Sequence, residues 1–403
     1  MKILIVSQVF WPENFKINDL CTEFISMGHE VTVITGKPNY PGGKFYAGYS
    51  FFSKFYDNYN GAKIYRIPLI PRGRATGIRL ALNYISFAFF ASFFLLLHRK
   101  KYDFSFVFGV SPITAALPAI IHRKIYKTRL ILWVLDLWPE SVLITGRLNS
   151  YFLYKRLSAL VKFIYRNCDK IFISSKMMQN SIANYLEKDS KIQIDYLPNW
   201  VEDSYFKRKP DKNKYATLIP KGFIVMFAGN IGYGQDVPAI IKTAQILKPY
   251  QQIKFVFLGD GSERELFEKN IKELDLEGSV FILGSYEVEE MPDFFVHADA
   301  MLISLRDEKI YSFTVPGKLQ SYMAANKPIL GMINGEAAEI IKKSECGVSV
   351  NAGNYQHFSE EILKLSQQPK SILDQMGKNG FEFCIKNFDK ESIINKIFIN
   401  SQV

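Results

Sequence analysis

The chain has 403 residues, too many for one hydrophobic core, so we expect two domains of about 200 residues each. Hydrophobic residues make up 48% of the sequence and charged residues 22%, which excludes a largely disordered protein. Lysine and arginine number 50 against 39 aspartates and glutamates, and the net charge of +11 favours nucleic acid, a phosphorylated substrate or anionic lipid as partner.

The amino-terminal segment "MKILIVSQVF" lacks a small-residue cleavage site, so it predicts a strand and not a signal peptide. The cysteines lie far apart, without a CxxC or Cys/His cluster. We therefore expect reduced core residues of a cytoplasmic protein and no zinc site. They are Cys21, Cys168, Cys346 and Cys384.

Strand and helix patterns alternate through the first half of the chain. An apolar, β-branched run at residues 2–10 predicts a buried parallel strand, and an amphipathic helix ending near Gly28 follows it. The alternation predicts a doubly wound parallel sheet. The further predicted strands are 30–35, 62–69, 104–109, 130–136, 170–175 and 192–199.

Polar residues follow several of these strands, and the carboxyl ends of parallel strands meet at one edge of a sheet. Asp136 and Glu140 could hydrogen-bond sugar hydroxyls or act as a base, while helix capping is the structural alternative for Glu140. The other residues expected at this edge are Glu13, Asn14, Lys16, Asn18, Asn39 and Tyr40.

Residues 80–97 form a run of 18 residues without a charge, flanked by basic residues on both sides. Three interpretations stay open: a buried core helix, a core helix that also docks on a membrane, and a membrane span. The flanking basic residues are Arg72, Arg74, Arg79, Arg99, Lys100 and Lys101. Further basic residues of the same half suit anionic lipid, with a solvated basic face as the alternative. They are His122, Arg123, Lys124, Lys127, Arg129, Lys155, Arg156 and Lys162.

A charged, proline-bearing stretch at 201–222 resembles an interdomain linker, and a second strand–helix series follows it. Its predicted strands are 223–229, 253–261, 279–285, 300–305 and 328–333. Its predicted helices are 236–248, 262–275, 289–297, 317–325 and 336–343. A helical segment at 355–403 is long enough to cross back to the first domain.

Two glycine-rich turns join strands to helices in this second series. "FAGNIGYGQD" at 227–236 is either a tight turn or a phosphate cradle, because glycines let a phosphate approach the backbone. "FLGDGSERE" at 257–265 contains a capping box of Ser262 and Glu265, which favours a structural role.

The segment "LISLRDEKIYSFTVPGK" at 302–318 places Arg306 and Lys318 at the carboxyl edge of the second sheet. A lysine at the start of a helix opposes the helix dipole, so a bound anion explains it better than solvent does. Two cations beside a helix amino terminus predict a diphosphate site.

Two Rossmann-like domains with these motifs resemble the GT-B glycosyltransferases of retaining family 4. The similar subgroup builds O-antigen, capsule and colanic acid and includes N-acetylfucosamine transferases. The resemblance covers essentially the whole chain. It is carried by "FWPENFKINDL", "GHEVTVITGKPNYPGG", "DLWPES", "LPNWV", "FAGNIGYGQ", "FLGDG" and "TVPGKLQSYMAANKPIL".

The resemblance implies that a nucleotide-sugar binds the second domain and the acceptor binds the first, without a metal. It assigns the leaving diphosphate to Arg306 and Lys318 and the nucleobase loop to "GSY" at 284–286. The full set of implied donor-binding residues is Gly229, Asn230, Gly232, Gln235, Gly259, Gly284, Ser285, Tyr286, Arg306, Val315, Pro316, Gly317, Lys318, Leu319, Gln320 and Ser321.

The sequence departs from the family pattern at two places. The family's paired glutamates fall at Phe313 and Ser321, so Gln320 or Ser321 would have to replace the ribose-binding carboxylate. The usual arginine and lysine after the first strand of the second domain are replaced by Asn230 and Gln235. These losses give Arg306 and Lys318 more importance.

We therefore expect a retaining, metal-independent glycosyltransferase without a cofactor, with an acceptor-binding domain at 1–200, a nucleotide-sugar domain at 201–378 and a returning helix at 379–403. The expected donor is a UDP-sugar carrying an N-acetylated or deoxy hexosamine. The expected acceptor is a polyprenyl-diphosphate-linked saccharide at the cytoplasmic face of the bacterial inner membrane. Asp136, Glu140, Arg306 and Lys318 are the expected catalytic residues.

Two alternatives stay open: an enzyme similar to UDP-N-acetylglucosamine 2-epimerase, and an inactive scaffold of a polysaccharide assembly complex. Only the net charge favours a nucleic-acid partner, because no RRM, KH or helix-turn-helix pattern is present in the sequence.

Overall fold

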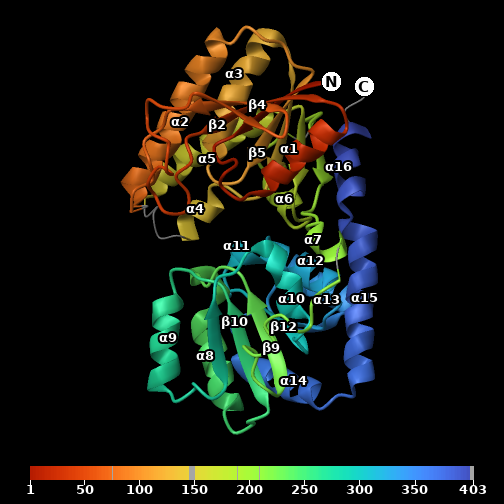
Figure 1. Ribbon diagram of the computed structural model, residues 1–403. Helices are drawn as coiled ribbons and strands as arrows, with labels where there is room; N and C mark the ends of the chain where they lie inside the picture. Colours follow the sequence, from red (N-terminus) through yellow and green to blue (C-terminus); the bar gives the residue numbers. More distant parts are fainter. Residues whose placement is uncertain (75, 145–149, 188, 208, 400–403) are drawn as a thin grey trace. The chain divides into compact units, whose positions relative to one another are not determined.

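The computed structural model describes residues 1–74, 76–144, 150–187, 189–207 and 209–399. It divides the chain into two compact units, Met1–Leu197 and Pro198–Val403, each with its own helix-covered sheet (Figure 1). The predicted fold class, two doubly wound parallel sheets, is confirmed. Residues 400–403 of the predicted returning helix lie outside the described part, and the return of that helix to the first domain stays a prediction.

The sheet of the first unit has eight strands in the order β3-β4-β2-β1-β5-β6-β7-β8, and β3 is its antiparallel edge strand. All seven predicted strands are present, and β5 is buried along its whole length because its apolar residues face helices on both sides. The bounds are β1 (Lys2–Ser7), β2 (Glu30–Gly36), β3 (Tyr56–Tyr59), β4 (Ala62–Ile67), β5 (Phe104–Gly109), β6 (Arg129–Val134), β7 (Lys170–Ile173) and β8 (Gln193–Tyr196).

Strand β3 is the one element of this sheet that the hydrophobic pattern did not predict. It pairs with β4 through a two-residue turn at Asn60 and Gly61, whose φ angles are 52° and 95°. Asn-Gly is the preferred pair for such hairpin turns, because both positions need a positive φ. The strand itself, "YDNY", has no buried residue and therefore no apolar run to reveal it.

The helices of the first unit connect these strands. They are α1 (Lys16–Ser26), α2 (Gly77–Leu97), the 3₁₀ turn η1 (Ile113–Ala115), α3 (Ala116–Tyr126), α4 (Glu140–Ile144), α5 (Tyr151–Arg166) and α6 (Met178–Ala183).

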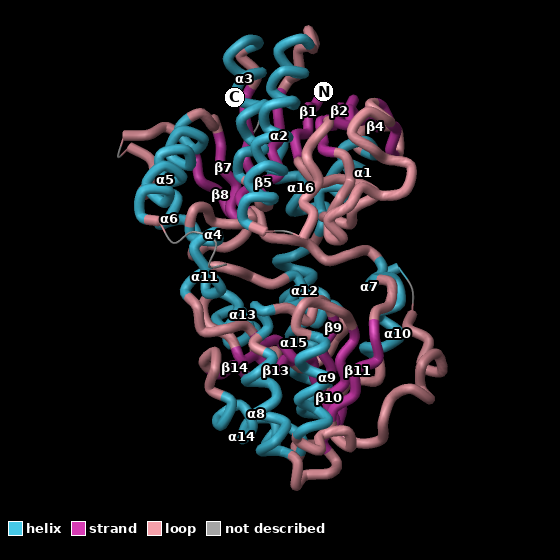
Figure 2. Tube along the Cα trace, turned by 90° about the vertical axis from the view of Figure 1, so that its left-hand side faces the viewer, coloured by secondary structure: helices cyan, strands magenta, loops and turns pink. Residues whose placement is uncertain are grey.

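Helix α2 buries one side and exposes an apolar stripe on the other. Its inner side lies against α3 (Figure 2), and the Asn83 amide anchors it by accepting from Gln8 Nε2 and donating to the Ile70 carbonyl, both at 2.6 Å. By length and composition α2 qualifies to cross a membrane, yet a third of its apolar window is buried in the protein. Helix α2 is therefore only partly buried, and the choice between a core helix, a core helix that docks on a membrane and a span stays open. The apolar residues more than half exposed are Ile78, Ile85, Phe89, Phe93 and Leu97.

The sheet of the second unit has six parallel strands in the order β11-β10-β9-β12-β13-β14. All five predicted strands are present, and the short "GVSV" strand β14 was not predicted. The bounds are β9 (Phe223–Ala228), β10 (Ile253–Leu258), β11 (Val280–Gly284), β12 (Ala300–Ser304), β13 (Ile329–Met332) and β14 (Gly347–Val350).

Helices α8, α9 and α14 share one core with this sheet, and α12 and α13 pack with α15 (Figure 1). All five predicted helical segments of this unit contain helix. The bounds are α7 (Ser204–Lys207), η2 (Tyr233–Gln235), α8 (Val237–Leu247), α9 (Arg264–Glu273), η3 (Val288–Glu290), α10 (Met291–Phe295), α11 (Lys309–Ser312), α12 (Gly317–Ala324), α13 (Glu336–Ser344), α14 (Tyr355–Ser366), α15 (Lys370–Phe388) and α16 (Lys390–Ile399).

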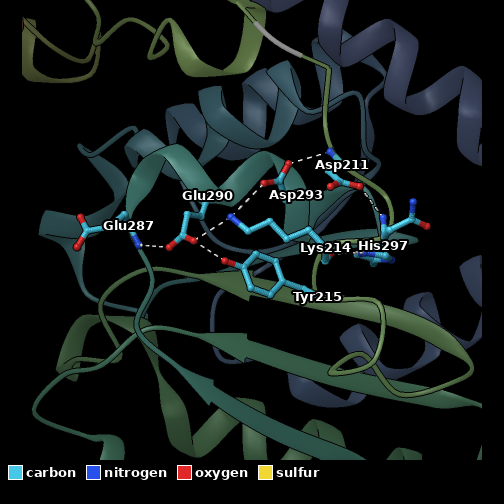
Figure 3. Close-up of polar contacts among 8 residues, drawn as sticks. Asp211, Lys214, Tyr215, Glu287, Glu290, Asp293 and His297 are labelled. Carbon is cyan, nitrogen blue, oxygen red and sulfur yellow. Dashed lines mark hydrogen bonds and ion pairs between the residues drawn. The ribbon is translucent and has the colours of Figure 1, made fainter.

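The stretch predicted as a linker instead packs on the second unit. Figure 3 shows Lys214 reaching Glu290 and Asp293, at 3.0 and 3.6 Å from their carboxylate oxygens. The Tyr215 hydroxyl donates to Glu290, and its ring stacks on Phe294 with centroids 3.9 Å apart. Lys214, one of the charged residues that indicated an interdomain linker, is thus paired with acidic residues at the start of α10.

Candidate functional site

The glycine-rich turn after β9 is fixed by the turn after β10. The Gly229 N–H donates to the Leu258 carbonyl at 2.8 Å, and the Ile231 N–H donates to Asp260 at 2.8 Å. The two turns approach so closely that a Cβ on Gly259 would lie 1.9 Å from the Gly229 carbonyl oxygen. Both glycines have a positive φ, which residues with side chains rarely adopt.

Lys318 reaches this turn from the first turn of α12. Its Nζ donates to Gln235 Oε1 at 2.7 Å and lies 3.6 Å from the centroid of the Phe227 ring. Gly229 makes room for the lysine, because a Cβ there would stand 2.8 Å from Lys318 Cε. Burial holds the pKa of Lys318 well below its usual range, and no carboxylate offsets that effect.

Arg306 reaches the same turn from the loop after β12. Its Nε donates to the Tyr233 carbonyl at 2.6 Å, and its guanidinium carbon lies 3.8 Å from the Tyr233 ring centroid. The Arg306 N–H donates to the Gly234 carbonyl at 3.0 Å. The two cations predicted for a diphosphate therefore contact one five-residue turn, 232–236.

The start of α12 adds backbone donors beside these cations. Pro316 is its extended N-cap residue and provides no side-chain cap, and Gly317 is exposed with open space where a Cβ would point. First-turn N–H groups that lack a capping side chain are available to an anion. Cations and helix amides together suit a phosphate or diphosphate.

The remaining residues of α12 divide between core and surface. Leu319 of the helix and Val315, which precedes it, are buried core residues. Gln320 is also buried, and its amide nitrogen faces the Pro316 and Gly317 carbonyls at 3.0 and 3.1 Å, so its polar group is already used within the helix. Of the two residues considered for the missing carboxylate, only Ser321 is partly exposed.

Glu202 supplies a carboxylate next to Ser321. The Ser321 hydroxyl lies 3.3 Å from Glu202 Oε2, although the two residues are far apart in sequence. Sequence reasoning missed Glu202, since "LPNWVED" was assigned to the family signature and the start of a linker. A polar residue directly after a signature motif was the available signal.

Other predicted donor residues lie at neighbouring strand ends. The Asn230 side chain is exposed and folds over Gly232, where a Cβ would stand 2.5 Å from Asn230 Nδ2. Gly284 accepts a hydrogen bond from the Gly259 N–H at 2.7 Å, which fixes the predicted nucleobase loop beside the β10 turn. Ser285 in that loop is exposed, and the Tyr286 ring packs 4.4 Å from Phe294.

In the first unit, Glu13 holds the loops after β1 and β2 together. Its Oε1 accepts from the Asn39 N–H at 2.8 Å and the Tyr40 N–H at 2.7 Å, and its Oε2 accepts from the Phe10 N–H at 3.3 Å. Burial raises the pKa of Glu13, although these backbone donors favour its charged form. Its carboxylate organises the loops and is not free for a ligand.

The other residues predicted after β1 and β2 differ in accessibility. Asn18 is buried between Trp11 and Glu13, accepting from the Trp11 N–H and donating to the Glu13 carbonyl. Asn14 is exposed, and Lys16 is the partly exposed first residue of α1. Tyr40 is 39% exposed.

Asn39 is buried and joins its own loop to the loop after β4 and to helix α2. Its Nδ2 donates to the Lys37 carbonyl at 2.9 Å, while its Oδ1 accepts from the Arg72 N–H at 3.0 Å and from Asn83 Nδ2 at 3.4 Å. The edge of this sheet therefore offers Tyr40 and Asn14 to a ligand, on a frame made by Glu13, Asn18 and Asn39.

Asp136 and Glu140 point to different partners. Asp136 Oδ2 accepts from both the N–H and the hydroxyl of Ser111, at 2.9 and 2.8 Å. Glu140 begins α4, and its charge adds to the effect of burial that raises the pKa of Tyr165 and Tyr185. Of the predicted pair, Asp136 thus lies at the loops after β5 and β6, and Glu140 lies near the buried Tyr165 and the partly buried Tyr185.

Across residues 1–74, 76–144, 150–187, 189–207 and 209–399, no group of three His, Cys, Asp or Glu residues is placed to hold a metal. The four cysteines are free and buried, as predicted. A surface depression lined by Lys2, Glu30, Tyr102 and Asp103 lies at the opposite, amino-terminal edge of the first sheet, away from the candidate residues.

Known families match both parts of the chain. Residues 17–204 match the family model "Glycosyltransferase Family 4", and residues 209–383 match "Glycosyl transferases group 1". The chain is 24% identical to WcaI of Escherichia coli (strain K12), over 99% of each chain, and the name of that protein places it in colanic acid biosynthesis.

Two solved structures share the fold over nearly the whole chain. Sucrose-phosphate synthase from Thermosynechococcus elongatus has a TM-score of 0.75 at 15% identity, covering 99% of this chain and 97% of that one. HepE of Anabaena, solved with UDP and glucose, has a TM-score of 0.69 at 14% identity, covering 100% of both chains. At these identities the likeness shows the fold alone.

Proposed function

Because the chain belongs to the family 4, group 1 glycosyltransferases and has the GT-B fold, we propose that it transfers a sugar from a UDP-sugar to a polyprenyl-diphosphate-linked saccharide. The sugar is an N-acetylated or deoxy hexosamine. The process is the synthesis of a bacterial surface polysaccharide, which is supported by the similarity to WcaI over 99% of both chains.

The observation that carries the donor assignment is the shared contact of Arg306 and Lys318 with one turn beside the start of α12. Departure of the nucleoside diphosphate leaves negative charge on its phosphates. Two cations and the first-turn amides of α12 stabilise that charge without a metal. The UDP in the HepE structure supports uracil as the base.

Two further contacts belong to this proposal. We assign the ribose hydroxyls to Ser321 together with Glu202, which takes the place of the family's glutamate. We assign a sugar hydroxyl to Asp136 Oδ1, because both contacts from Ser111 fall on Oδ2 and fix the carboxylate. The reaction retains the configuration of the transferred sugar, as the family resemblance implies.

We further propose that the protein is peripheral to the cytoplasmic face of the inner membrane and docks through α2. The exposed apolar stripe of α2 has Arg79 near its start and is followed by the basic run Arg99–Lys101, which complements anionic lipid. Phe89→Glu should release the protein from vesicles of anionic phospholipid, whereas Phe163→Glu on α5 serves as the control. Equal vesicle binding of Phe89→Glu and the wild type would overturn docking through α2.

Thermal stabilisation by UDP, GDP, TDP, CMP and their sugars, measured in EDTA, tests the function. We expect a shift with UDP and a larger shift with one UDP-sugar, since a ligand that binds the folded state alone raises the melting temperature. A shift that requires added metal would refute the metal-independent site. No shift with any nucleotide would favour the inactive scaffold.

A further inference from the structure

Two buried cations lie at the carboxyl ends of neighbouring strands in the first unit. Lys37 directly follows β2, and Arg66 is the next-to-last residue of β4. Strands β2 and β4 pair in parallel, with Gly36 opposite Ile67. Lys37 is 0% exposed and Arg66 is 1% exposed, which is unusual for such residues.

These cations have fewer partners than buried charges normally have. Arg66 Nη2 donates to the Trp11 carbonyl at 2.5 Å and to Asp57 Oδ2 at 3.2 Å. Among the described residues, Arg66 Nε, Arg66 Nη1 and Lys37 Nζ have no hydrogen-bond acceptor. The Lys37 ammonium lies over the face of Phe55, 4.3 Å from the ring centroid.

The two nearest carboxylates do not satisfy these donors. Glu13 accepts three backbone N–H groups, and the Arg66 charge favours its ionised form without a hydrogen bond between them. Asp57 accepts from Arg66 Nη2, from the Tyr49 hydroxyl and from the Asn58 N–H, which leaves Arg66 Nε, Arg66 Nη1 and Lys37 Nζ without an acceptor among the described residues. Burial and the neighbouring guanidinium lower the pKa of Lys37 to about 8. A buried donor without an acceptor is destabilising, and more so when it is charged, so three of them on two neighbouring strands call for a ligand.

We propose that Lys37 and Arg66 bind a phosphoryl group, and that this group is the diphosphate of the lipid-linked acceptor. The assignment to the acceptor rests on the proposed function, whereas the anion site rests on the unsatisfied donors. Phosphate oxygens accept several charge-assisted hydrogen bonds at once, which matches donors from two cationic side chains. The site adjoins the Glu13–Asn39 frame, from which Tyr40 is exposed.

Aromatic rings separate this site from solvent. Phe55 covers Lys37 and is 51% exposed, so the ring that covers the ammonium lies at the surface. The rings of Tyr49 and Trp11 lie 5.3 and 5.8 Å from the Arg66 guanidinium carbon. Movement of the Phe55 ring opens the site, and the phosphoryl group then takes the position of the ring beside Nζ.

Calorimetric titration of the full chain with farnesyl diphosphate tests the proposal, in the presence of saturating UDP so that the donor site is filled. Lys37→Met should bind farnesyl diphosphate at least about tenfold more weakly than the wild type, as expected for the loss of a charged hydrogen bond. Lys63→Met, at an exposed lysine on β4, the strand that carries Arg66, is the matched control and should bind normally. Equal affinity of Lys37→Met and the wild type would overturn the site.

Other variants and ligands separate the remaining possibilities. Phe55→Ala should bind farnesyl diphosphate more tightly than the wild type, because it uncovers Lys37, and weaker binding would contradict the covering role. Inorganic pyrophosphate that binds as tightly as farnesyl diphosphate would overturn the lipid-linked acceptor and leave a free-phosphate site.

UDP binding separates this proposal from the proposed function. If UDP binds normally to Lys37→Met and farnesyl diphosphate binding does not depend on Lys37, the inference fails and the proposed function survives. If UDP binds no variant and farnesyl diphosphate binding depends on Lys37, the phosphoryl site stands without the glycosyltransferase assignment.

Discussion

The two units hold their cations in different ways. In the second unit, Lys318 and Arg306 contact a fixed turn that provides an amide oxygen and backbone carbonyls. In the first unit, Lys37 Nζ lies against the Phe55 ring and has no hydrogen-bond acceptor within the part of the chain that the structure describes. The second unit therefore keeps its cations in place before a ligand arrives, whereas the first unit leaves hydrogen-bond donors that a ligand can satisfy. This difference is consistent with a preorganised donor site in the second unit and with an acceptor site in the first unit that opens when its ligand binds.

Among the substitutions that test this difference between the units, replacing Lys318 should have the largest effect, on UDP affinity. Lys318→Met keeps the alkyl chain against Phe227 and removes the charge that we assign to the diphosphate. UDP binding should weaken by about 1.5–3 kcal/mol, or roughly 10- to 150-fold, as for a hydrogen bond to a charged group. Calorimetric titration with UDP measures this loss of affinity, and Lys343→Met, at an exposed lysine on α13, is the control. Unchanged affinity would mean that the diphosphate lies elsewhere.

Gly229→Ala tests whether the turn is as rigid as the contacts imply. The new Cβ would stand 2.8 Å from Lys318 Cε on a residue with φ of 128°. We expect a loss of about 1–2 kcal/mol in the free energy of unfolding, from a sparsely populated backbone conformation, and weaker UDP binding.

Gly317→Ala is the matched control for this substitution. Open space surrounds its Cβ position, and alanine is favoured over glycine in a helix, so the variant should be as stable as the wild type or slightly more so. Urea denaturation of both variants provides the comparison. A Gly229→Ala protein as stable as Gly317→Ala would show that the turn can relax away from the lysine.

Much of this fold could be predicted from sequence, because parallel strands buried on both faces leave apolar runs. Arg306 and Lys318 were predicted since both follow strands of one sheet, where ligands bind. Lys37 and Arg66 were missed because one sequence does not show that a lysine is buried, and their neighbours in "GKPN" and "YRIP" are ordinary. The docked linker was missed because its acidic partners on α10 are about 75 residues away.

Lys37→Met should stabilise the folded protein, whereas most core substitutions destabilise it. Removing a buried charge without an acceptor should raise the free energy of unfolding by about 1–2 kcal/mol at pH 7. The folded pKa of Lys37, about 8, lies below the ordinary 10.5, so the unfolded state binds more protons between these values. Wild-type stability therefore rises relative to the variant above pH 8, and the advantage of the variant shrinks toward pH 10.

Urea denaturation at pH 7 and pH 10, with Lys63→Met as the control, measures both parts of this prediction. A Lys37→Met protein less stable than the wild type at pH 7 would indicate that the ammonium has an acceptor in the apo protein. The contrast between the two units would then disappear, since both would hold their cations in advance.

The smallest effect should come from Glu290→Gln, at the contact that docks 211–215 on the second unit (Figure 3). Hydrogen bonds from Tyr215 and Lys214 lower the pKa of Glu290 below its ordinary 4.5. Its stabilising contribution is therefore complete above pH 4.5 and is lost as the pH falls through the folded value. Thermal melts should show Glu290→Gln slightly less stable than the wild type at pH 7, with the difference vanishing in acid, and Glu277→Gln unchanged. A pH-independent difference would mean that Tyr215 stacking on Phe294, and not the carboxylate, holds the segment in place.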